Sequence, residues 1–198
     1  MVPTVPHPRP ALSARTAAPW APWYEDELGW ATVTAPGEPV LLRTGLRFDV
    51  LELPAAAGHA VLRRVGPTGP VALLGQRMRL FVAAGSADEV PSLLEWLEWG
   101  SVALDLRAIG TGGLIAAPAP PGTAPSAAGG AALWLRPPVP GGEWEHSLPV
   151  FAGIGDRGAA PDLVRLVAAA ATECHRARLS HVNTGLPKER QTQPLAFS

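Results

Sequence analysis

Proline and glycine interrupt this chain so often that few long regular segments remain. The 198 residues include 23 prolines and 21 glycines, more than an average domain carries. Proline breaks helix interiors and central strands, and glycine favours turns. The chain must therefore fold from short elements joined by many turns, with some length outside regular structure.

The same punctuation suggests where the folded part begins and ends. Residues 1–22 are rich in proline and alanine without periodicity, which is typical of a disordered arm. Residues 182–198 form a polar, proline-containing tail, and residues 118–130 are typical of a long flexible loop. We expect a single folded domain over residues 23–181.

Short apolar runs within this body predict strands, and two longer periodic runs predict helices. Ser86 and Glu89 have the spacing of a capping box, and Gly100 suits the residue after the helix end, so a helix is predicted between them. A second helix is predicted over residues 160–179, with Pro161 in its first turn. Its apolar stripe comprises Leu163, Leu166, Val167, Ala170, Cys174 and Ala177. Strands are predicted at 29–34, 39–45, 46–53, 69–75, 77–85, 101–110, 112–118 and 131–138.

The order of these elements is mixed rather than strictly alternating. Strands outnumber helices, which predicts an α+β fold with a mixed or mostly antiparallel sheet and two to three packed helices.

Charge is unevenly distributed along the sequence, although the net charge is only −1. Residues 43–79 carry six arginines and two acids, whereas residues 86–105 carry five acids and no cation. The two segments either form a dipolar surface or neutralise each other in the fold, and we expect the second. The near-zero net charge gives no global attraction to nucleic acid or to an anionic membrane.

The sequence also argues against a disulfide and against a membrane span. Cys174 is the single cysteine, so no intramolecular disulfide or cysteine-cluster metal site is expected. The N-terminal residues lack the apolar core of a signal peptide, and no stretch approaches the roughly 20 apolar residues that span a membrane. We expect a cytoplasmic protein with no membrane partner.

The stretch "RTGLRFDVLELPAAAG", residues 43–58, reads as a strand that runs into a helix and carries two acids, Asp49 and Glu52. Side chains two apart along a strand share a face, so Asp49 shares its face with Leu51, and Glu52 points to the other side. A metal-binding D-x-D pair needs both carboxylates on one face. Leucine occupies the partner position, so the pair is broken unless a bulge intervenes.

Four segments occur together in an order that resembles a known family. They are "TGLRFDVLELP", "RMRLFVAAG", "SVALDLRAIGTGGLIAAPAPPG" and "AALWLRPPVPG". The series resembles the N-terminal domain of bifunctional DNA primase/polymerases (Prim-Pol), in particular a short standalone actinobacterial branch, over about residues 28–141. The resemblance implies an RRM-like, primase–polymerase-type sheet joined to a second small α/β layer.

The resemblance also implies a site. Active members bind two divalent metals through a D-x-D/E pair and a later acid, and a strand histidine binds the phosphates of the incoming nucleotide. Asp49 matches the first acid and Asp105 the later acid, whereas Leu51 stands in place of the second. The segment that should carry the histidine has none, and Arg79 is its nearest polar residue.

The resemblance therefore predicts a degenerate Prim-Pol domain, with Asp49 and Asp105 as vestigial catalytic residues and no cofactor. Such a domain would bind a nucleotide, weakly a nucleic acid, or a protein. The candidate phosphate-binding residues are Arg47, Arg77, Arg79 and Arg107.

Two alternatives stay open at this point. A bulge could bring Glu52 beside Asp49 and Asp105, giving an active DNA primase/polymerase that uses Mg²⁺ or Mn²⁺. Alternatively, the chain is a protein-interaction module that binds its partner through the N-terminal arm and exposed tryptophans in 19–30.

Overall fold

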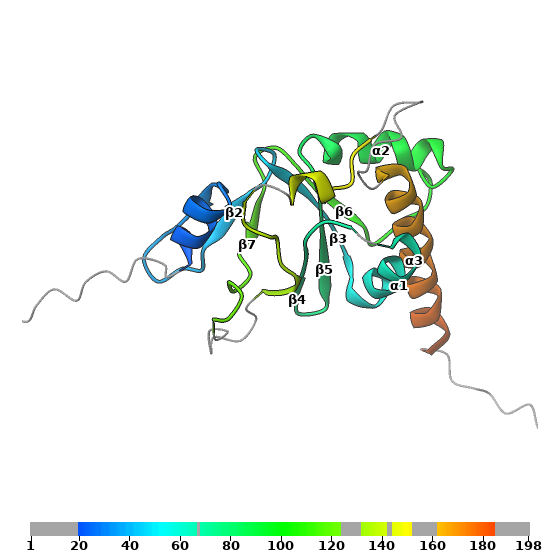
Figure 1. The fold of residues 1–198 in the computed structure, drawn as a ribbon. Helices are drawn as coiled ribbons and strands as arrows, with labels where there is room; N and C mark the ends of the chain where they lie inside the picture. The colour runs from blue at the N-terminus through cyan, green and yellow to red at the C-terminus, as the bar shows by residue number, and fades with distance from the viewer. Residues whose placement is uncertain (1–19, 67, 124–131, 142–143, 152–161, 185–198) are drawn as a thin grey trace, which may run out of the picture.

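The computed structural model describes residues 20–66, 68–123, 132–141, 144–151 and 162–184, with side chains described up to residue 180. It has the α+β architecture predicted from the sequence (Figure 1). The helical elements are a π-helix η1 (Trp23–Glu27), α1 (Ala55–Val65), α2 (Ser86–Trp96), a 3₁₀ turn η2 (Glu145–Ser147) and α3 (Leu163–Thr184). The strands are β1 (Thr32–Val33), β2 (Leu41–Arg43), β3 (Phe48–Pro54), β4 (Val71–Leu74), β5 (Arg77–Ala83), β6 (Arg107–Ile109), β7 (Leu114–Ala116) and β8 (Leu133–Arg136).

The strands form two antiparallel sheets. The larger has the order β6-β3-β5-β4-β8, and the smaller has the order β1-β2-β7. In Figure 1 the helices α1, α2 and α3 lie on one side of the larger sheet, and the smaller sheet lies on the other. The larger sheet thus has one helix-covered face and one face turned toward the smaller sheet.

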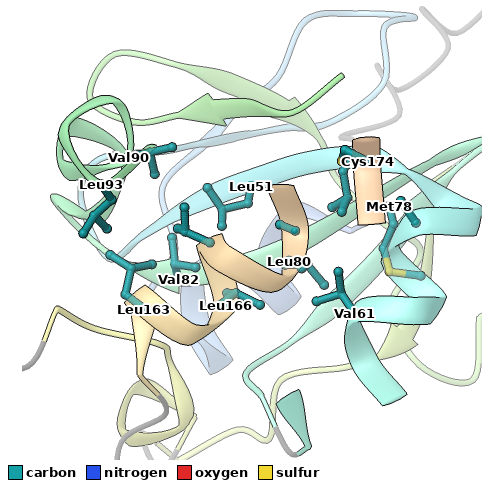
Figure 2. Close-up of a cluster of buried hydrophobic side chains, with 14 of the residues drawn as sticks. Leu51, Val61, Met78, Leu80, Val82, Val90, Leu93, Leu163, Leu166 and Cys174 are labelled. Atoms are coloured by element: carbon teal, nitrogen blue, oxygen red, sulfur yellow. The ribbon is translucent and has the colours of Figure 1, made fainter. Parts of the chain in front are cut away.

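The helix-covered face is packed with aliphatic side chains. Alternate residues of β3 and β5 point into it, among them Leu51 and Leu80, and the predicted stripe of α3 packs against them. Figure 2 shows Leu163, Leu166 and Cys174 over these strands. Helix α1 approaches β5 closely at Gly58, where an added Cβ would lie 2.3 Å from the sulfur of Met78.

The opposite face of the sheet is dominated by aromatic rings. Six residues form this aromatic cluster: Tyr24, Trp30, Phe48, Phe81, Trp134 and Trp144. Trp30 lies at its centre, with ring centroids 4.4 Å from Phe48 and 5.5 Å from Phe81. The prediction that the tryptophans in 19–30 are exposed is therefore wrong: Trp30 is 1% exposed, and Trp20 and Trp23 are partly buried against the same cluster.

Two of the connections between the sheets run together. The link from β2 to β3 passes against the Gly110–Gly113 turn between β6 and β7: the N–H of Thr44 donates to Gly113 O at 3.1 Å, and its hydroxyl donates to Gly110 O. The turn itself is closed by a 3.0 Å bond from the N–H of Gly113 to Gly110 O. Residues 110–113 thus form a β-turn, which fixes where β6 lies beside β3.

Some predicted boundaries need correction. The strand expected over 101–110 is regular only at Arg107–Ile109. Before it, the carbonyls of Ala103 and Asp105 accept hydrogen bonds from Arg178 and Cys174 of α3 instead of from a neighbouring strand. The arm expected over 1–22 and the tail expected over 182–198 lie mostly outside the described residues, as does Pro161.

Both ends of α2 differ from the prediction. Gly85 is the N-cap residue, and Ser86 makes no capping hydrogen bond, so the capping box is wrong. At the other end the helix closes before Gly100. Glu98 adopts φ +65°, and the N–H groups of Glu98 and Trp99 donate to Glu95 O and Leu94 O at 3.0 and 2.8 Å. This is a Schellman motif with glutamate in the position where glycine is usual.

Among the described helices, none is long and apolar enough to cross a membrane.

Candidate functional site

Asp49 is fully buried on the helix-covered face of β3. Its Oδ2 accepts a 2.9 Å hydrogen bond from the backbone N–H of Ala87 in the first turn of α2. Among the described residues its Oδ1 has no hydrogen-bond partner. Burial raises the pKa of Asp49, and the Ala87 N–H opposes this rise only in part. Asp49 therefore acts as an N-terminal cap of α2, supplied by a strand that lies far away in the sequence.

Glu52 lies on the opposite face of the same strand. In the register of the sheet it stands directly between Arg79 of β5 and Arg107 of β6. Its Oε2 accepts from Nε of Arg79 at 2.8 Å, and its Oε1 lies 3.4 Å from Nε of Arg77. The side chain is 13% exposed, so this carboxylate is held by arginines in a largely buried position.

Strand β3 pairs with β5 in an unbroken register from Phe48 to Pro54, so no bulge brings Asp49 and Glu52 to one side. Leu51, in the position of the second acid, is buried in the aliphatic core. The separation of Asp49 from Glu52 confirms the alternation predicted from the sequence.

Asp105 precedes β6 and does not join Asp49. Its Oδ1 accepts from the Nη1 of Arg77 at 2.7 Å, and its side chain is 61% exposed. The two acids implied by the family resemblance, Asp49 and Asp105, and the alternative ligand Glu52 are thus bound separately, one to a helix end and two to arginines. Their arrangement does not fit a shared pair of divalent cations, which needs carboxylates converging on one point.

The structure instead assembles a group that we call the arginine cluster: Glu52, Arg77, Arg79, Asp105 and Arg107. Arg79 is its deepest member, with a side chain 8% exposed, and its Nη1 also donates to Ala116 O of β7 at 3.3 Å. Arg77 lies farther out at 27% exposure and bridges Glu52 to Asp105. Arg107 is exposed and makes no ion pair with any described residue.

The electrostatics of the arginine cluster leave an excess of positive charge. Three guanidinium groups face two carboxylates, which gives a local balance of +1. Burial lowers the pKa of Arg77, but the hydrogen bond and charge of Asp105 and the charge of Glu52 outweigh it, so the pKa is raised overall. Arginine stays protonated in proteins, so the three guanidinium groups count as cations. They lie on one sheet face, on strands β5 and β6, which flank β3.

Arg47 does not belong to this group. It lies before the opposite end of β3 and pairs with Glu145 at 2.5 Å, with its guanidinium carbon 6.0 Å from the ring centroid of Trp144. It lies five positions before Glu52 along the extended chain, or roughly 16 Å away. The prediction that Arg47 shares a phosphate site with the other arginines is not supported by this placement.

The sequence held a partial signal for the arginine cluster. Arg77 and Arg79 alternate with Met78 and Leu80, which places both arginines on one face of their strand. What the sequence could not supply was the pairing of β3 with both β5 and β6, which puts Glu52 among them. The prediction treated Glu52 only as a possible metal ligand and missed its role as an arginine partner.

The charged segments neutralise each other only locally. Of the acids in 86–105, Asp105 alone pairs with an arginine of 43–79 in the described structure, through Arg77.

The N-terminal arm, predicted to bind a protein partner, lies outside the described residues up to residue 19.

Comparison of the chain with protein-family models, with curated proteins and with solved structures gives no match.

Proposed function

We propose that this chain is a cytoplasmic, catalytically inactive Prim-Pol-like domain that binds the phosphate groups of a nucleotide at the arginine cluster. The observation that carries the proposal is the convergence of Arg77, Arg79 and Arg107 on one sheet face with one more positive than negative charge. Arginine presents a planar fork of donors that matches phosphate oxygens.

The arrangement of the cluster supports a division of roles. Arg79 is held on two sides, by Glu52 and by the Ala116 carbonyl, so it is a fixed cation at the bottom of the site. Arg107, which has no ion-pair partner among the described residues, offers all its donors to a ligand. Arg77 is intermediate between Arg79 and Arg107: it is partly buried, and it pairs with Glu52 and Asp105.

The separation of the three acids supports the inactive state. Nucleotidyl transfer by two metals requires carboxylates that hold both cations beside the reacting phosphate. Here Asp49 caps α2 on the helix-covered face, while Glu52 is bound by two arginines on the other. An active enzyme using Asp49, Glu52 and Asp105 would need β3 to be rebuilt.

A nucleotide is favoured over a nucleic acid strand because the cationic surface is compact. Binding to an extended phosphate backbone uses many separate lysine and arginine contacts. The chain has a net charge of −1, and the arginine cluster supplies one local site rather than a track.

Isothermal titration of the full chain with dATP tests the binding role. We expect saturable binding that Arg107→Ala weakens at least about tenfold, because a hydrogen bond between charged groups is lost. Arg165→Ala is the matched control: it removes an exposed arginine of α3 that forms no ion pair with described residues, and it should leave the affinity unchanged. Absence of dATP binding, or equal loss in both variants, would refute the nucleotide site.

Primer extension tests the inactive state separately. With a primed template, dNTPs and either Mg²⁺ or Mn²⁺, we expect no incorporation above background. Incorporation that is abolished by Asp105→Asn would show that the acids do catalyse transfer and would overturn this part of the proposal.

A further inference from the structure

The two carboxylates of the arginine cluster differ sharply in how firmly they are held. Glu52 is 13% exposed and contacts two arginines, with one oxygen directed to each. Asp105 is 61% exposed and contacts Arg77 through a single oxygen at 2.7 Å. Glu52 is therefore a buried counter-ion of the arginines, whereas Asp105 forms an ion pair at the surface only.

We propose that Asp105 is a displaceable counter-ion that occupies Arg77 until a polyphosphate group replaces it. This inference rests on the proposed nucleotide-binding function and adds its regulation by the chain's own carboxylate. The ligand class is a polyphosphate chain, either inorganic or part of a nucleoside triphosphate.

The backbone around Asp105 permits such an exchange without a change of fold. The Asp105 carbonyl accepts a 3.6 Å contact from the Cys174 thiol, and the Ala103 carbonyl accepts a 2.7 Å hydrogen bond from Arg178. Helix α3 therefore anchors the main chain of this segment, while the exposed carboxylate can leave Arg77 by rotation about its own side-chain bonds.

The position of Arg107 gives the incoming group a reason to displace Asp105. Arg107 follows Asp105 by two residues and stands opposite Glu52 in the sheet register. A polyphosphate carries several anionic oxygens and can engage both Arg77 and Arg107, whereas Asp105 engages Arg77 with one oxygen. Exposed ion pairs contribute little free energy, so the exchange has a small cost.

The test compares dATP and inorganic triphosphate as probes, without divalent cations, by isothermal titration of the full chain. Removing the competing carboxylate with Asp105→Asn should tighten binding of both probes about two- to fivefold, the range that an exposed ion pair supplies. Asp105→Ala, which also removes the acceptor oxygen, should tighten binding at least as much. Glu89→Gln is the matched control for net charge, because Glu89 is an exposed acid of α2, and it should leave both affinities unchanged.

The outcomes separate this inference from the function on which it rests. If the unmodified chain binds dATP and both Asp105 variants bind equally or more weakly, the counter-ion role is wrong and the nucleotide site stands. If tightening occurs with dATP and not with triphosphate, the exchange does not involve the phosphate chain, and the inference fails. If neither the unmodified chain nor the variants bind either probe, both proposals are overturned. A urea unfolding curve for each variant establishes that it is folded.

Discussion

Strand β3 places a carboxylate on each face of the larger sheet, and the two faces treat it differently. On the helix-covered face Asp49 is fully buried and accepts a hydrogen bond from the backbone N–H of Ala87. On the opposite face, beyond the aromatic cluster, Glu52 meets two guanidinium groups. The first carboxylate is used to hold a helix, and the second neutralises cations. The surroundings, not the residue type, decide what a buried acid does.

The two faces also differ in how they tolerate buried charge. A buried carboxylate without a cation favours its neutral form, which is why burial raises the pKa of Asp49. A carboxylate between arginines is stabilised as an anion, and removing it leaves buried cations behind. The two acids should therefore respond differently to neutralisation, and substitutions at Glu52 and at Asp49 test this.

The largest effect is expected at Glu52. Glu52→Leu should lower the free energy of unfolding by about 3–5 kcal/mol, because Arg79, with a side chain 8% exposed, loses its carboxylate partner. Urea unfolding measures the change.

A double variant makes this prediction sharper. Adding Arg79→Met to Glu52→Leu removes the stranded cation and should restore much of the lost stability, since replacing both members of a buried pair is often tolerated. Asp105→Asn is the control for an exposed member of the same cluster and should cost less than about 1 kcal/mol. If Glu52→Leu alone is neutral, the arginine cluster is not an electrostatic unit, and the contrast between the two faces is lost.

The next effect concerns Asp49 on the helix-covered face. Asp49→Ala should cost about 1–3 kcal/mol, because the N–H of Ala87 is left buried without an acceptor. Asp49→Asn retains an acceptor oxygen and should cost less. Equal losses in the two variants would mean that packing, and not the hydrogen bond to α2, explains the role of Asp49.

The pH dependence of the same pair identifies the charge state. The pKa of Asp49 in the folded protein is raised above the ordinary value of 3.8, so the folded state binds this proton more tightly than the unfolded state. The resulting stability is fully present below pH 3.8 and is lost as the pH rises through the raised pKa. The unfolding free energy of the unmodified chain relative to Asp49→Asn should therefore fall with rising pH. A relative stability that rises over this range would show that Asp49 is stabilised as an anion, like Glu52.

The two acids also show how far sequence reasoning reaches. Alternation along β3 correctly separates Asp49 from Glu52, because the pleat is a local property of the strand. The buried face of α3 was also predictable, since the stripe from Leu163 to Cys174 follows from periodicity alone. The capping of α2 by Asp49 could not be predicted, because Asp49 and Ala87 lie 38 residues apart in the sequence. The sequence predicts a local capping box instead. A local pattern contains no signal for a capping side chain that belongs to another strand or helix.

The same limit applies to the candidate site. Alternation within β5 is enough to put Arg77 and Arg79 on one face, whereas the addition of Arg107 and the exclusion of Arg47 depend on strand pairing. The central position of Trp30 depends likewise on packing between two sheets. Side-chain alternation and periodicity within one element were predictable, and features set between elements were not.

The smallest effect lies at the other end of α2 and separates local from long-range control of this helix. Glu98 holds φ +65° at the closing turn, a conformation that costs a non-glycine residue about 1 kcal/mol or more. Glu98→Gly should raise the unfolding free energy by about 0.5–1 kcal/mol, the remainder being offset by the greater freedom of glycine in the unfolded chain. Glu95→Gly is the matched control within the helix and should lower it by about 1 kcal/mol. Urea unfolding of the two variants should thus give changes of opposite sign. A loss of stability in Glu98→Gly would mean that the glutamate side chain itself holds this end, so that α2 depends on an acid at both termini.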